Sequence, residues 1–176
     1  MVTRVSIGGV LTSVAVCLAG EFAFFEAQAQ LDEAASRLQF SCIVDTDVPE
    51  LMARTGDVKV SVVSWDSAEI AISPESTPAA DCQASAARFQ TLHDAGLLHY
   101  ITTGRMDGQL VVCAAEVAQG RCVGRLFDLV STQRPRRSLQ RVLSIRLPTE
   151  GPIEETGPRP YVSWTRLLQG DYMSEN

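Results

Sequence analysis

The chain has 176 residues, with 15 basic and 21 acidic side chains and a net charge of −6. This balance excludes a general nucleic-acid binder, because such proteins offer the phosphates an excess of positive charge. The basic residues are unevenly distributed, since seven arginines fall between positions 121 and 146, where Asp128 is the one acid.

Residues 1–29 have the pattern of a signal peptide. Arg4 precedes an apolar run over residues 5–18, and Ala27 and Ala29 are small residues at the positions that a signal peptidase recognises. A retained membrane anchor is the alternative, but the run has about 14 residues, whereas a spanning helix needs roughly 20. We therefore expect the protein to be exported and the leader to be removed.

The remaining chain is expected to form one domain over residues 30–147, followed by a Pro-rich C-terminal tail over residues 148–176. A domain of this length can bury a core large enough to fold alone. Its order of elements predicts the α+β class, namely a small disulfide-stapled domain with an antiparallel sheet and two helices.

The first half of this domain contains two predicted strands and one helix. The strands cover residues 39–44 and 58–65. Pro49 and Gly56 break the chain between them, and the Ser, Thr and Pro residues of 73–80 indicate a loop. A helix is predicted over residues 82–95, with Gly96 as its stop. One face of this helix would carry Ala86, Phe89, Gln90 and His93.

The second half begins with a predicted β-hairpin. Residues 97–102 and 109–116 are strand-like runs joined through Asp107 and Gly108, and an Asp-Gly pair favours the positive φ angles of a tight turn. Residues 126–130 are apolar and fit either a strand or a helix start. A second helix is predicted over residues 135–146, where apolar residues recur at helical spacing.

Aromatic residues give two further expectations. Phe40, Trp65 and Phe89 fall on apolar strand or helix patterns and are predicted to lie in the core. In the tail, a short amphipathic piece around Trp164 and Leu167 would either dock on a partner or cover an edge of its own domain. We favour the second alternative.

Several short motifs occur in the order and rough spacing of one cyanobacterial family. They are Phe40-Ser41-Cys42, Trp65, Cys82, Arg88-Phe89-Gln90, Gly96, Tyr100-Ile101-Thr102-Thr103-Gly104, Asp107-Gly108, Cys113, Cys122 and Leu126-Phe127-Asp128-Leu129. Over residues 38–146 the chain therefore resembles the circadian oscillating polypeptide domain family. It departs from the family pattern at Asp81, where Arg is frequent, and at Asp107, where the family turn has Asn. The resemblance implies an exported protein that can associate with a membrane, and it implies no catalytic activity.

Four cysteines remain after removal of the leader, which would take Cys17 with it. A disulfide role fits Cys42, Cys82, Cys113 and Cys122, because their separations of 40, 31 and 9 residues lack the close pairs typical of a zinc site. Three pairings are open. We favour Cys42 with Cys82, which joins the first strand to the helix start, and Cys113 with Cys122, which closes a short loop after the hairpin.

Catalytic motifs are missing from the sequence. His93 and His99 are the two imidazoles, and each is more simply explained as a surface or half-buried structural residue. The chain contains no G-x-S-x-G nucleophile elbow and no phosphate-binding loop ending in Lys. We therefore predict no enzymatic activity, no cofactor and no metal.

An arginine stretch is the main candidate for binding. Arg134, Arg136 and Arg137 would project from a turn and helix start, followed by Arg141, and guanidinium groups form bidentate contacts with carboxylate or phosphate. The alternative is a solvated helix face. The resulting hypothesis is an exported accessory or interaction protein, placed in the periplasm or thylakoid lumen at the periphery of a membrane, with a protein or an anionic membrane surface as its partner and without nucleic acid.

Two other hypotheses belong to different classes. The first is a small-ligand or cell-envelope binding domain, with a cleft between the sheet and the helix that follows Cys82. The second is a hydrolase, which requires His93 or His99 within hydrogen-bond reach of a serine or an acid.

Overall fold

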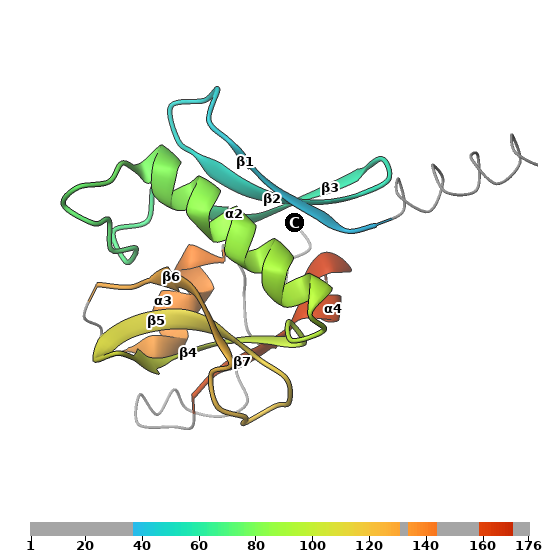
Figure 1. Ribbon diagram of the computed structural model, residues 1–176, viewed down its shortest axis with the longest axis vertical. Coiled ribbons are helices and arrows are strands. Elements are labelled where there is room, and N and C mark those ends of the chain that lie inside the picture. Colours follow the sequence, from blue (N-terminus) through green and yellow to red (C-terminus); the bar gives the residue numbers. More distant parts are fainter. Residues whose placement is uncertain (1–36, 131–133, 144–158, 171–176) are drawn as a thin grey trace, which may run out of the picture. The chain divides into compact units, whose positions relative to one another are not determined.

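The computed structural model describes residues 37–130, 134–143 and 159–170. The elements are β1 (Gln39–Ile43), β2 (Glu50–Thr55), β3 (Val58–Ser64), α2 (Pro78–Asp94), β4 (Tyr100–Met106), β5 (Gln109–Ala115), β6 (Gly124–Asp128), α3 (Pro135–Val142), β7 (Tyr161–Ser163) and α4 (Trp164–Leu168). All of them belong to one unit that begins at Leu38 (Figure 1). The predicted signal peptide, the end of the second predicted helix and most of the predicted tail lie outside the described residues.

The strands form two antiparallel sheets. One has the order β1-β2-β3 and the other the order β6-β5-β4-β7. Figure 1 shows α2 between the two sheets, and α2 contacts β1 and β2 of the first and β6 of the second. The prediction of a small disulfide-stapled α+β domain is confirmed, and among the described elements α4 is a helix in addition to the two predicted.

The first sheet contains a strand that the sequence did not indicate. β2 fills the interval between Pro49 and Gly56, which we had interpreted only as chain breaks. Leu51 and Ala53 alternate toward the core and are at most 1% exposed, which is the periodicity of a half-buried strand. The signal is weak because β2 has no β-branched residue before Thr55 and only these two inward apolar residues.

Helix α2 begins four residues earlier than predicted. Thr77 is its N-cap and its hydroxyl accepts a hydrogen bond from the backbone N–H of Ala80, while Pro78 occupies the first turn. The Ser, Thr and Pro residues that indicated a loop are thus also the start signal of the helix. Gln90 binds α2 to the edge of β1, because its side chain accepts from Phe40 N at 3.0 Å and donates to Leu38 O at 3.3 Å.

The hairpin between β4 and β5 is confirmed. Asp107 and Gly108 have φ angles of 52° and 79°, as a two-residue turn of the primed type requires. The apolar run that fitted a strand or a helix start forms β6, which pairs antiparallel with β5. The other edge of the same sheet is β7, which pairs with β4 over Tyr161–Ser163.

The core is continuous between the two sheets. Phe89 is fully buried and Trp65 is 7% exposed, while Phe40 is partly buried and packs against the core cluster. The prediction of three core aromatics is therefore confirmed. Trp65 meets Phe127 of the second sheet at a ring-centroid distance of 5.8 Å. Trp164 lies 5.4 Å from Phe40 and 6.0 Å from Phe89. The C-terminal segment therefore covers an edge of its own domain, the alternative that we favoured.

Replacing Trp164 with alanine should lower the free energy of unfolding by about 3–5 kcal/mol, because a large core aromatic would leave a cavity between both sheets and α2. Urea denaturation of the purified protein measures this loss. Thr165→Ala is the matched control, since Thr165 is the exposed neighbour on α4. Equal midpoints for the two variants would show that the C-terminal segment is dispensable for the core.

Candidate interaction surface

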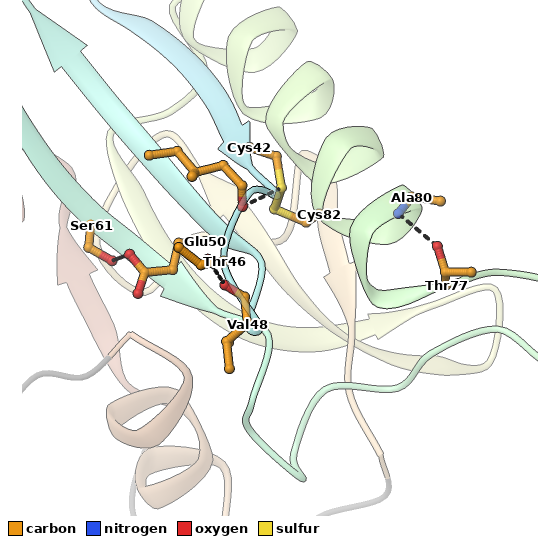
Figure 2. Close-up of a disulfide and its surroundings, with 9 residues drawn as sticks. Cys42, Thr46, Val48, Glu50, Ser61, Thr77, Ala80 and Cys82 are labelled. Carbon is orange, nitrogen blue, oxygen red and sulfur yellow. Dashed lines mark hydrogen bonds between the residues drawn. A yellow bond between two sulfur atoms is a disulfide. The ribbon is translucent and has the colours of Figure 1, made fainter.

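The first disulfide joins β1 to the first turns of α2. Cys42 and Cys82 are bonded with a Cα–Cα distance of 5.8 Å, and Figure 2 shows the bridge between the strand and the helix. Cys82 is fully buried and belongs to the hydrophobic core. This bridge therefore fixes α2 on the first sheet, next to the residues that Gln90 binds.

The second disulfide lies on the other sheet. Cys113 of β5 is bonded to Cys122, which precedes β6, with a Cα–Cα distance of 5.5 Å. Gly104 of β4 lies directly beneath it, and a Cβ at this position would collide with Cys122 Sγ. Glycine is thus required where the bridge crosses β4. Both bonds match the pairing that we favoured from the sequence, and they indicate an oxidising, non-cytoplasmic environment.

The two histidines have structural contacts. His93 is half-buried, and its ring meets Phe40 edge-on at 5.9 Å. His99 is exposed, and its Nε2 lies 3.0 Å from the backbone oxygen of Gly96. Within the described ranges, no group of three His, Cys, Asp or Glu residues is placed to hold a metal ion.

The interval between α2 and the sheets is filled by side chains. Cys82, Ser85, Ala86 and Phe89 form the buried face of α2 and are at most 6% exposed. The cleft that we considered for a small ligand would have to lie at this interface. In the described residues the space is occupied by core packing.

Helix α3 separates its residues into a buried and an exposed side. Ser138, Leu139 and Val142 are buried, as is Leu143 directly after the helix. The predicted binding residues Arg134, Arg136, Arg137 and Arg141 are all exposed. The backbone of Arg134 also begins the helix, because its carbonyl accepts from Ser138 N at 3.0 Å.

Glu69 anchors this helix to the connection between β3 and α2. Its Oε1 lies 2.7 Å from Arg141 Nη1, and its Oε2 accepts a hydrogen bond from the Ser138 hydroxyl at 2.8 Å. Arg141 therefore has a structural role in holding α3 to this connection. The sequence did not indicate Glu69, since a single acid in a loop carries no signal for a partner 72 residues away.

The fold and these sites define the class of the protein: a small α+β domain with two disulfides and an exposed basic helix start. The family model of the circadian oscillating protein COP23 matches residues 39–169, which is most of the chain, and the chain belongs to this family. The resemblance seen in the sequence is thereby confirmed. Searches of curated proteins and of solved structures found no match.

Replacing Glu69 with alanine should destabilise the protein by about 1–3 kcal/mol, mainly through the lost bond to the buried Ser138, because the exposed Arg141 pair contributes little. Thermal and urea unfolding measure the effect. Glu75→Ala is the matched control, as it removes an exposed carboxylate from the same connection. If both variants unfold alike, Glu69 does not anchor α3.

Proposed function

We propose that the protein is an exported, non-catalytic interaction module that binds an acidic partner through the first turn of α3. We call Arg134, Arg136 and Arg137 the arginine surface. The observation that carries the proposal is their common exposure within four residues, in a turn that contains no acid. The rest of the chain is acidic, with a net charge of −6 for the whole sequence.

The position of these arginines favours an anionic partner. The N-terminus of a helix carries a partial positive charge, and the three arginines add to it. The combined positive charge attracts a carboxylate of an approaching partner. The helix below is held in place by the Glu69 contacts and by the buried side chains of Leu139 and Val142. A surface with a fixed backbone loses less conformational entropy when it binds.

The buried side of α3 favours a protein over a lipid surface. An interfacial helix binds a bilayer with an exposed apolar face, but the apolar side chains of α3 pack in the core. Attraction to an anionic membrane would then rest on charge alone, at about 1 kcal/mol per arginine. None of the helices in the described ranges has the length and apolar run needed to cross a bilayer. We therefore place the partner among acidic proteins of a membrane complex.

Location in the periplasm or the thylakoid lumen is part of the proposal. The leader pattern of residues 1–29 supports export, and the two disulfides agree with an oxidising compartment. The absence of a nucleophile elbow or a phosphate loop from the sequence supports a non-catalytic role.

Changing Arg134, Arg136 and Arg137 together to serine should reduce recovery of the partner about tenfold or more, because interfacial arginines frequently dominate binding energy. The measurement is crosslinked co-purification of the tagged protein from native cells, with quantitative mass spectrometry. The control changes Arg54, Arg105 and Arg121 to serine. These residues are also exposed, and both variants lower the net charge by three, from −6 to −9.

A discrete acidic partner that is lost only from the first variant supports the proposal. Loss from both variants would show that net charge, not the arginine surface, determines binding. Sedimentation with vesicles that contain anionic lipids is run in parallel. Arginine-dependent binding to vesicles without a protein partner would replace the acidic protein by a membrane surface.

A further inference from the structure

An arginine lies beside the second disulfide. Cys113 Sγ, Cys122 Sγ and Arg159 Nη1 all lie within 3.5 Å of one point, the position that a Cβ of Gly104 would take. These atoms come from β5, from the segment before β6 and from the residue that precedes Pro160. Because Gly104 has no side chain, the guanidinium group and both sulfur atoms lie around the same small space.

This guanidinium has no other partner in the part of the chain that the structure describes. Arg159 is exposed and makes no hydrogen bond or ion pair there. Arg125 of β6 differs, because it binds Asp107 at 3.1 Å and Asp128 at 3.5 Å. A cation close to a cysteine stabilises the thiolate that forms when a disulfide is opened. The positive charge of Arg159 is available for that purpose.

The first disulfide has the opposite surroundings. The polar contact of Cys42 Sγ is with the backbone oxygen of Ile43 at 3.8 Å (Figure 2), and a carbonyl oxygen disfavours negative charge on sulfur. Cys82 and Cys113 are both fully buried, so burial alone does not distinguish the two bridges. Cys82, however, packs in the hydrophobic core cluster, where a thiolate would be poorly solvated. Opening this bridge is therefore electrostatically less favourable than opening the second.

We infer that Cys113–Cys122 is a redox-active disulfide that a dithiol reductant opens while Cys42–Cys82 stays closed. A thiolate of the reductant attacks the half-buried Cys122 Sγ, the S–S bond breaks, and Cys113 leaves as a thiolate beside Arg159. The second thiol of the reductant then displaces Cys122 from the mixed disulfide. The protein gains two electrons and the dithiol becomes a disulfide. Of the two protons that the dithiol gives up, Cys122 takes one, and the other goes to solvent while Cys113 remains a thiolate.

Opening the bridge would release the segment between β5 and β6. This segment carries Val117, which is 62% exposed. Two other contacts hold it, namely a hydrogen bond from the Tyr161 hydroxyl to Gly120 O at 2.6 Å and one from Val123 N to Ala114 O at 2.9 Å. Reduction therefore changes the constraint on one surface loop, while Cys42–Cys82 still joins β1 to α2.

The test exposes the oxidised full-length protein to dithiothreitol for increasing times without denaturant. Free thiols are trapped by alkylation, and each cysteine is quantified by peptide mass spectrometry. Cys113 and Cys122 should become free together, at least about tenfold faster than Cys42 and Cys82, because a stabilised thiolate is the better leaving group.

Three variants examine the role of the cation. Arg159→Gln should slow reduction of the second bridge by about tenfold, and Arg159→Lys should restore part of the rate because it returns the positive charge. Arg54→Gln is the matched control, an exposed arginine on β2 whose loss should leave the rate unchanged. In the reduced protein, the ultraviolet absorbance of thiolate at neutral pH should be lower for Arg159→Gln than for Arg54→Gln.

Simultaneous opening of both bridges would overturn the inference, since it would show that reduction follows global unfolding. A wild-type rate for Arg159→Gln in a protein with unchanged circular dichroism would equally overturn the role of Arg159. Neither outcome bears on binding through the arginine surface.

Discussion

The packing of Trp164 against Phe40 and Phe89 connects three segments that are far apart in the chain. Phe40 belongs to the first sheet, Phe89 to α2, and Trp164 follows β7 of the second sheet. One sheet has three strands and the other has four, and the apolar face of each must be covered by another element. The aromatic cluster gives both sheets a common core, and β7 together with α4 brings the C-terminal segment into it.

This common core also determines where the charged residues of α3 lie. Leu139 and Val142 are fully buried, and the arginines of α3 lie on its exposed side. Glu69 then fixes the helix along its length, because its two carboxylate oxygens bind residues one helical turn apart, Ser138 and Arg141. The exposed cations are therefore a consequence of core packing on the opposite side of the helix.

Turns and other local features could be predicted from the sequence, whereas the packing of distant segments could not. The turn at Asp107 and Gly108 could be predicted because it depends on the backbone preferences of two adjacent residues. The start of α2 was misplaced because Thr77 and Pro78 carry signals for both a loop and a helix cap. The division of the strands between two sheets could not be predicted, since it depends on which strands pair, and the alternation of apolar residues is the same in either arrangement.

For the candidate sites, the residue types could be predicted but their roles could not. The sequence contains several arginines near the C-terminal half, and nothing local distinguishes them. In the structure, Arg125 pairs with two aspartates, Arg141 binds Glu69, and Arg159 lies near the second disulfide at Gly104. The energetic effect of a guanidinium group depends on the charge and burial of what it faces. Strand pairing and core packing determine those neighbours. The role of a basic residue therefore depends on the tertiary structure and cannot be derived from the local sequence.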